Sequence, residues 1–332
     1  MSDNLFPDRR LTLKACYQFY RRGLSHTEIA RNLRISRFQV ARLLQSALQD
    51  GYVTVKILEP VPWHADLERE LEERFGLRAA IVVDGWELDD PELKLRVADA
   101  AGRYILEILR DDDVLGLSLG STVQALVSQL PDRVRKKVEV VQLIGGSRHG
   151  GSELGSMILT TALAGRFRSR PHLLFAPAVV QGVNVQRLLL ADPNIRATFE
   201  MFKKVSVSVV GIGSLATDPT SRLLYGGIID ECLLRRMRGQ GGIGDLLSFI
   251  FDKDGRVLEG GLEDRVISVP LEDYLRVPYR IGVAAGEAKA EAIGAALRGG
   301  LVNVIVTDSG AAQVIAAMQT GGAVEETQGL AR

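Results

Sequence analysis

Short runs of mostly apolar, often β-branched residues recur along the chain after residue 78, separated by stretches of helical character. The runs are AAIVV (79–83), VLGL (114–117), VEVVQLIG (138–145), HLLFAP (172–177), VSVSVVGIG (205–213), RVISV (265–269), RIGVAA (280–285) and VNVIV (302–306). Continuous apolar runs are typical of strands buried on both faces, as in a parallel sheet between layers of helices. The sequence therefore predicts a large, doubly wound, mainly parallel α/β domain. Ligands of such sheets bind beyond the carboxyl ends of the strands, where candidate site residues should lie.

The run at 114–117 is followed by the small or hydroxyl-bearing residues Ser118, Gly120, Ser121 and Thr122, and then by a helical segment. Small residues let backbone amides approach a bound anion, and the hydroxyls add hydrogen-bond donors. The spacing differs from the GxGxxG of dinucleotide-binding folds and from the GxxxxGK[ST] of P-loops. We therefore expect a phosphate or a similar anion here, although Ser121 or Thr122 could instead serve only to cap a helix.

Other positions near the ends of these runs are further candidates for ligand binding. Gly145 and Gly146 end one run, and glycine-rich turns of this kind serve either a ligand or tight packing. Asp245 lies between glycines and an apolar stretch, where a carboxylate needs a hydroxyl or a cation as its partner. Lys289 falls in the first turn of a helix, where the helix dipole disfavours a cation unless an anion is bound. Alternatively, Lys289 is an exposed residue balanced by neighbouring glutamates, and Asp308 is either a helix N-cap or a ligand.

The segment 24–52, LSHTEIARNLRISRFQVARLLQSALQDGY, predicts two short amphipathic helices joined by a tight turn, the pattern of a DNA-binding helix-turn-helix. Ser36 is placed to cap the second helix, whose outward face presents Arg37, Phe38, Gln39 and Arg42. Arginine pairs bidentately with guanine edges or phosphate, and glutamine with adenine, so we expect these residues to bind DNA. The apolar positions of the two helices are Ile29, Ala30, Leu33, Val40, Leu43, Leu44, Ala47 and Leu48.

The turn of this motif carries Arg34, at a position where glycine is common because it tolerates a positive φ. Either Arg34 adopts that conformation, or the turn differs and the recognition helix begins elsewhere. The local charge supports DNA binding, since residues 9–42 hold nine Lys or Arg against one acid, Glu28, although the whole chain has 41 basic and 41 acidic residues. Such a positive surface supplies the phosphate contribution to DNA affinity. The alternative is a plain helical hairpin with a solvated basic face.

These patterns divide the chain into a helix-turn-helix domain (1–58), a linker with a connecting helix (59–76) and the α/β effector domain (77–328). In the first region, the alternating VTVKIL (53–58) suits a strand that would close a winged helix-turn-helix. In the second, the prolines of EPVPW mark a linker, and Leu67, Leu71 and Phe75 form an apolar stripe on a helix. The stripe could pair two copies or dock on the neighbouring domain, and its short length favours docking.

Composition limits the remaining possibilities. No long uncharged apolar run could span a membrane, and the N-terminus lacks the apolar stretch of a signal peptide, so we expect a cytoplasmic protein. Cys16 and Cys232 fall in different predicted domains, and the four histidines are scattered. We therefore expect reduced thiols, no metal and no cofactor.

The helix-turn-helix, followed by GLSLGSTV, VVQLIGG, FAPAVV, VVGIGSL, GIGDLLSFIFDKDG and VAAGEAKAEAIGAALRGGLVNVIVTDSGAAQVI, resembles the SorC family of bacterial sugar-operon transcription regulators. The resemblance covers nearly the whole chain. It implies a DNA-binding head fused to an effector domain related in fold to phosphosugar isomerases, usually assembled as a tetramer and controlled by a sugar or sugar phosphate. It also implies that the effector phosphate is held by Ser118, Gly120, Ser121 and Thr122, and that Asp245 and Lys289 face the sugar.

We interpret the chain as a sequence-specific DNA-binding regulator of a carbohydrate or polyol utilisation operon, with operator DNA, an effector and further copies of itself as partners. Effector binding would change the relative stability of two arrangements of the oligomer, one of which spaces the heads for the operator. The main alternative is a phosphosugar isomerase or aldol-type enzyme with a DNA-binding head, in which Lys289 forms a Schiff base and Asp245 transfers protons. A third possibility is a domain that only oligomerises.

Overall fold

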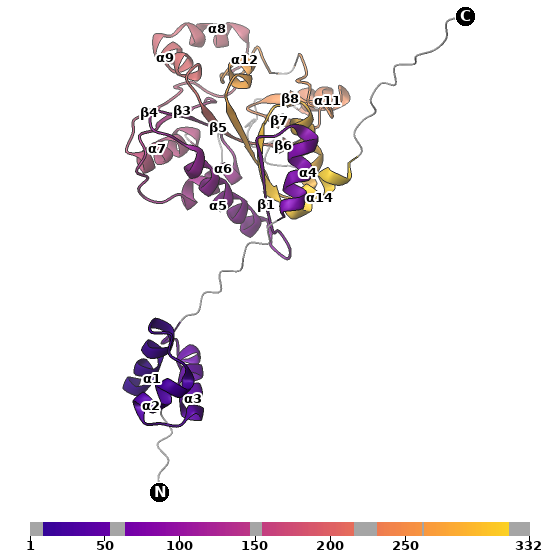
Figure 1. Cartoon of the computed structure of the whole chain (residues 1–332). Coiled ribbons are helices and arrows are strands. Elements are labelled where there is room, and N and C mark those ends of the chain that lie inside the picture. The colour runs from indigo at the N-terminus through magenta and orange to yellow at the C-terminus, as the bar shows by residue number, and fades with distance from the viewer. Residues whose placement is uncertain (1–8, 54–63, 147–154, 216–230, 261, 319–332) are drawn as a thin grey trace, which may run out of the picture. The chain divides into compact units, whose positions relative to one another are not determined.

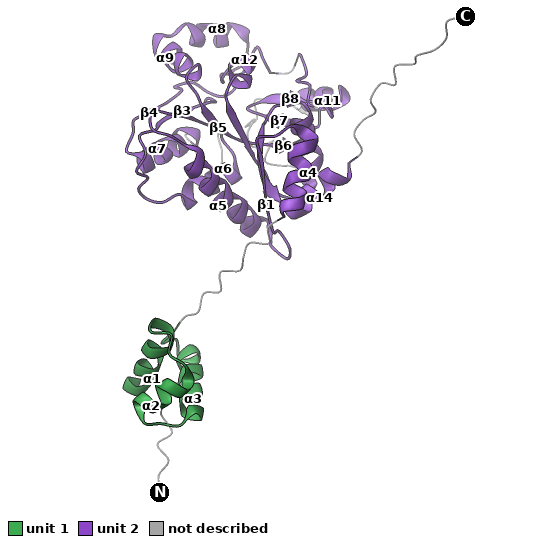
Figure 2. Cartoon of the chain, in the orientation of Figure 1, with its two compact units in different colours: residues 1–60 green, residues 61–332 purple. Residues whose placement is uncertain are grey.

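The computed structural model describes residues 9–53, 64–146, 155–215, 231–260 and 262–318. The chain divides into two compact units, residues 1–60 and 61–332 (Figure 2). The predicted wing strand at 53–58 falls almost entirely outside the described residues.

The first unit is a small helical bundle. It contains α1 (Arg9–Cys16), a short π-helical segment η1 (Tyr17–Arg21), α2 (His26–Leu33) and α3 (Arg37–Gln49). The predicted pair of helices is confirmed, and its apolar stripes pack with α1 into one core. That core consists of Ala15, Cys16, Ile29, Ala30, Val40, Leu43, Leu44 and Ala47. We predicted Leu48 on the same stripe, and this prediction is wrong. Leu48 is 44% exposed near the end of α3 and does not belong to the core.

The second unit is built on a parallel sheet, as the apolar runs predict. The strands of this sheet that the structure describes are β1 (Ala79–Val83), β2 (Val114–Leu117), β3 (Glu139–Gln142), β4 (Pro171–His172), β5 (Val207–Gly211), β9 (Tyr279–Val283) and β10 (Val304–Asp308). They lie in the order β1-β10-β9-β5-β2-β3-β4, and every neighbouring pair is parallel. From β4 to β10 this is the 3-2-1-4-5-6 order of a doubly wound fold, in which the direction of winding reverses between β2 and β5.

Helices cover both faces of the sheet, and every residue of β2 and of β10 is buried as a result. One group contains α5 (Asp90–Ile108), α6 (Ser121–Gln129) and α7 (Gly155–Phe167), and another contains α4 (Ala65–Phe75), α13 (Ala290–Arg298) and α14 (Ser309–Ala317) (Figure 1). The remaining described elements are α8 (Val183–Ala191), α9 (Pro193–Phe202), α11 (Glu231–Gly239), α12 (Leu271–Leu275) and the 3-10 turn η2 (Glu287–Lys289).

Two predicted strands are corrected, and one small sheet was not predicted. Of the run at 172–177, only His172 lies in a strand, β4. The run at 265–269 forms no strand and joins its neighbours through isolated bridges, Val266 to Val179 and Ser268 to Ile144. A small antiparallel sheet was not predicted: β6 (Gly213–Ser214), β7 (Gly244–Leu246) and β8 (Phe249–Phe251) pair in that order. The run at 205–213 thus continues beyond β5 into a second sheet, and this sheet lies beside the functional site described below.

Helix α4 docks on the second unit, as the length of its apolar stripe favours. Leu71 is fully buried, with Leu67 and Phe75 packed beside it. The carboxylates of Glu68 and Glu72 accept hydrogen bonds at 2.8 Å from the backbone amides of Val82 and Ala80, respectively. The helix therefore covers the outer edge of β1, which is an edge strand of the sheet in the described part of the chain.

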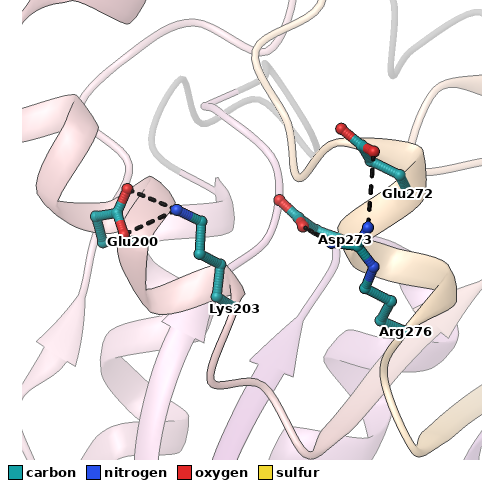
Figure 3. Close-up of polar contacts among 5 residues, drawn as sticks. All are labelled: Glu200, Lys203, Glu272, Asp273 and Arg276. Carbon is teal, nitrogen blue, oxygen red and sulfur yellow. Dashed lines mark hydrogen bonds and ion pairs between the residues drawn. The ribbon is translucent and has the colours of Figure 1, made fainter.

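Surface ion pairs stabilise the helices that precede β5 and β9. At the end of α9, Nζ of the C-cap residue Lys203 lies 2.9 Å from both carboxylate oxygens of Glu200 (Figure 3). On α12 and its C-cap, Arg276 lies 3.4 Å from Asp273 and 3.9 Å from Glu272 (Figure 3). Pairs of this spacing contribute only about 0.2–0.5 kcal/mol each. They belong to the end of the sheet at which β5 and β9 begin, whereas ligands of doubly wound folds bind at the opposite end.

Candidate effector cleft and DNA-binding surface

A cleft lies beyond the carboxyl ends of β2 and β5, where the winding of the sheet reverses. The space between its walls measures about 610 Å³, a value that includes open solvent at the mouth. Six segments contribute to it: the turn between β2 and α6, the residue Ile144 after β3, the residues that link β5 to β6, the β7–β8 hairpin, the end of β9 and the turn η2. Its lining contains Ser118, Leu119, Gly120, Ser121, Thr122, Ile144, Gly211, Ile212, Gly213, Asp245, Leu247, Ser248, Val283 and Lys289.

The turn after β2 presents the N-terminus of α6 to this cleft. The buried hydroxyl of Ser118 accepts a hydrogen bond at 3.2 Å from the Gly211 amide, which fixes the turn to the end of β5. Gly120 is the N-cap of α6, and no side chain caps the helix there. The structure therefore argues against Ser121 or Thr122 being only caps. The first amides of a helix lack partners within it and carry partial positive charge, so this turn suits an anion.

Asp245 enters the cleft from β7. The residue is 5% exposed and pairs in register with Gly213 of β6. A Cβ atom at position 213 would collide with Oδ1 of Asp245, so a glycine is needed there to admit the carboxylate. A buried carboxylate is a strong acceptor for hydroxyl donors.

Lys289 approaches from η2, directly before α13. Its side chain is partly buried, and Nζ donates to the carbonyl oxygen of Ile212 at 3.4 Å. The turn that carries Lys289 is held by Asp308, whose carboxylate accepts from the Gly286 amide at 2.6 Å and from the Ala311 amide at 3.0 Å. Asp308 is thus the N-cap of α14, and it is absent from the described lining of the cleft.

Gly145 and Gly146 are absent from the described lining of the cleft. Their amides donate to the carbonyl oxygens of Ile267 and Ala176, at 2.9 and 2.7 Å. A Cβ at Gly145 would lie 2.6 Å from backbone atoms of Ala176 and Pro177, which is too close. Close backbone packing thus accounts for Gly145, while the preceding residue of the chain, Ile144, lines the cleft.

Several lining residues were not predicted from the sequence as site residues. Gly211 and Gly213 carried a weak signal, because glycines follow the apolar run that forms β5. Leu247 and Ser248 carried none, since they lie inside an apolar stretch that hides a hairpin.

In the first unit, Arg34 adopts the left-handed conformation that the turn requires, with φ 56° and ψ 44°. The recognition helix α3 therefore begins where the sequence predicts. Its N-cap is Ser36, whose hydroxyl accepts from the Gln39 amide while the Gln39 side chain accepts from the Ser36 amide. Helix α2 opens with the same arrangement between Ser25 and Glu28.

The predicted DNA-binding residues share one exposed face at the start of α3. Ser36, Arg37, Phe38, Gln39 and Arg42 are all exposed, and the Phe38 side chain, at 90%, is nearly free of contacts. Aromatic side chains of this size are normally buried, so this exposure fits a surface that is covered when DNA binds.

Three further observations concern the described residues only. Among them, no cluster of His, Cys, Asp or Glu has the makings of a metal site. None of the described helices combines the length and apolar character needed to span a bilayer. Cys16 is buried in the first unit, Cys232 is exposed on α11, and neither forms a disulfide.

A helix-turn-helix joined to a doubly wound domain with a cleft at its switch point defines the class of ligand-responsive transcription regulators. Comparison with known proteins identifies the family of the chain. The family described as "Putative sugar-binding domain" matches residues 60–317. The Deoxyribonucleoside regulator of Bacillus subtilis is 30% identical over 308 residues, covering 92% of this chain and 97% of that protein. The chain belongs to this sugar-binding family and, with it, to the SorC family of transcriptional regulators.

A relative that is named for an operon, and a relative of known structure, agree with this assignment. The Sorbitol operon regulator of Klebsiella pneumoniae is 28% identical over 312 residues, covering 93% of this chain and 98% of that protein. The crystal structure of full-length SorC from the same organism superposes with a TM-score of 0.79 at 26% identity, covering 95% of this chain and all of the other. The mixed α/β fold is thereby confirmed.

Proposed function

We propose that this regulator binds operator DNA through α3 and controls genes of carbohydrate or polyol utilisation in response to a sugar phosphate held in the cleft. The observation that carries the proposal is the convergence on one cleft of six predicted residues from three separate segments of the chain. These are Ser118, Gly120, Ser121, Thr122, Asp245 and Lys289.

The phosphate end of the effector is assigned to the N-terminus of α6. The amides that follow Gly120 and the hydroxyls of Ser121 and Thr122 supply donors, and the Lys289 ammonium supplies positive charge from the other side. Backbone amides at a helix N-terminus together with a cation are a common way to bind phosphate. Asp245 then accepts from hydroxyls of the carbohydrate.

The signal to DNA requires that the effector bind two arrangements of the protein unequally. We propose a homo-oligomer, a tetramer by resemblance to the SorC family, because a helix-turn-helix reads one half-site and operators of such proteins contain two. The protein acts where operator DNA is found, in the cytoplasm. Light scattering with and without a sugar phosphate tests the number of copies.

Effector binding is tested by the unfolding temperature against free and phosphorylated sugars and polyols, since a ligand that binds only the native state raises it. We expect phosphorylated compounds to stabilise the protein and their free counterparts to do so less. Thr122→Val should retain operator binding in a gel shift and lose most of the response to the sugar phosphate. A response equal to that of the parent protein would place the phosphate elsewhere.

The enzymatic alternative has a direct test. The relatives reported above are named as regulators, and we propose that the cleft binds its ligand without turnover. Lys289 could form a Schiff base with a carbonyl sugar, so borohydride trapping followed by mass spectrometry, together with an assay for isomerised or cleaved product, separates the two cases. Product formation that disappears in Lys289→Met would establish catalysis.

A further inference from the structure

The hairpin that carries Asp245 into the cleft turns through two residues with unusual backbone angles. In the β7–β8 pair, Leu246 lies opposite Phe249, so Leu247 and Ser248 form a two-residue turn. Both have positive φ, 52° for Leu247 and 71° for Ser248. Tight hairpin turns of this kind strongly prefer Asn or Gly, because the left-handed region costs other residues about 1–2 kcal/mol each.

The burial of these two residues sets them apart. Of the described residues, six that are not glycine have positive φ, and the other four, Arg34, Glu87, Asp112 and Arg168, are exposed. Leu247 is 5% exposed and Ser248 is 8% exposed. Hairpin turns normally lie at the surface of a protein. Here the chain keeps two side chains in a strained turn and directs them inward.

Both side chains line the effector cleft on the same hairpin as Asp245. Within the described part of the chain, no hydrogen bond engages the Ser248 hydroxyl. The hydroxyl oxygen is not fully buried, so it stays accessible to water or to a hydroxyl of a bound ligand. Backbone strain of this kind is concentrated at binding sites, where it holds side chains in the positions that a ligand requires.

We propose that Leu247 and Ser248 determine which carbohydrate the cleft accepts. The Ser248 hydroxyl hydrogen-bonds a sugar or polyol hydroxyl next to the one held by Asp245, and Leu247 forms an apolar wall that limits the size of the carbohydrate. This inference rests on the proposed function, in which the phosphate lies at the N-terminus of α6. Sites that hydrogen-bond a ligand hydroxyl discriminate strongly against analogues that lack it.

Two variants of Ser248 separate its hydroxyl from its backbone strain. The full-length protein is titrated with glucose 6-phosphate, fructose 6-phosphate, ribose 5-phosphate and glucitol 6-phosphate, and its unfolding temperature is measured. Ser248→Gly removes both the hydroxyl and the strain, and Ser248→Ala removes only the hydroxyl. Both should weaken the tightest of these ligands by about tenfold, the loss expected for one hydrogen bond. Only Ser248→Gly should raise the unfolding temperature.

Arg168→Gly is the matched control. Arg168 has φ 55°, is exposed and lies outside the described lining of the cleft. Glycine there should also raise the unfolding temperature, because it relieves the same kind of strain, while every affinity and the order of the four ligands stay unchanged. The control shows whether stabilisation by itself alters ligand binding.

The outcomes are distinct. If the parent protein binds one or more of the four compounds and both Ser248 variants keep its affinity and their order, the inference about the turn is overturned while the proposed function stands. If the parent protein binds none of them, the proposed function and this inference fail together. Weaker binding in both Ser248 variants, combined with unchanged binding in Arg168→Gly, supports the assignment.

Discussion

The side-chain oxygen of Gln39 accepts a hydrogen bond from the Ser36 amide at 2.9 Å, and the Ser36 hydroxyl accepts one from the Gln39 amide at 3.1 Å. Gln39 therefore holds the start of α3 together, and a bidentate contact with adenine would need the same oxygen. Loss of a helix cap costs about 1 kcal/mol, so Gln39→Ala should lower the stability of the first unit by that amount. Gln39→Glu should retain it, since glutamate also completes a capping box. Denaturant unfolding of both variants compares the two; equal stabilities would contradict the capping role.

Arg37 is the exposed first residue of α3. If it contacts a base edge, Arg37→Ala should weaken binding to the operator by about 1–3 kcal/mol and relax the preference at one base position. Arg31→Ala, on the preceding helix, is the comparison: a phosphate contact there would weaken binding to all sequences alike and reduce the salt dependence. Gel-shift titrations against operator and unrelated DNA distinguish the two patterns. Unchanged operator affinity in Arg37→Ala would rule out its assigned role.

Arg74 joins α4 to the end of α14. Its guanidinium donates to the carbonyl oxygens of Ala316 at 2.7 Å and Ile315 at 3.2 Å, and also to that of Met318. Hydrogen bonds from charged groups contribute about 1.5–3 kcal/mol, so Arg74→Met should lower the free energy of unfolding of the second unit by about 2 kcal/mol. Arg69→Met on the same helix removes only an exposed ion pair with Asp66 and should change little. Equal effects of the two substitutions in chemical denaturation would count against a capping role for Arg74.

We expect Glu28 to contribute to the dependence of the first unit's stability on pH. Hydrogen bonds from the Ser25 hydroxyl and then from the Ser25 amide lower the pKa of its carboxyl below the ordinary value of 4.5. A lowered pKa in the folded state means that the carboxylate stabilises the fold above pH 4.5 and that this contribution is lost as the pH falls further. Glu28→Gln keeps the cap without the charge. The stability difference between parent and variant should therefore shrink as unfolding is measured at progressively lower pH, and a constant difference would contradict the assignment.

The sequence predicts the strands whose residues all pack in the core. The strands β2 and β10 are buried on both faces, so their apolar runs coincide with them within about two residues. The β7–β8 hairpin was missed because Leu247 and Ser248 stand where a turn normally shows Asn or Gly. A turn whose residues line a cleft can lack the Asn or Gly by which a turn is recognised in a sequence.

The same reasoning explains the candidate site. Ser118, Thr122 and Lys289 could be found because they follow apolar runs, and the carboxyl ends of parallel strands meet at one edge of the sheet. Gly145 satisfies the same criterion, yet backbone atoms of Ala176 and Pro177 approach it so closely that packing requires the glycine. That contact joins distant segments of the chain, and local sequence does not reveal it.

The docking of α4 on β1 also bears on how copies of the protein can associate. Glu68 and Glu72 occupy amides of that edge, and the opposite edge strand, β4, has only two residues, the first of which is a proline without an amide hydrogen. Among the described residues, neither edge of the main sheet thus offers a row of open amides to a strand from another molecule. The association of copies that we propose would therefore not use the two edges of the main sheet, and an unfolding event that frees α4 would expose β1 to the edge-to-edge pairing that begins aggregation.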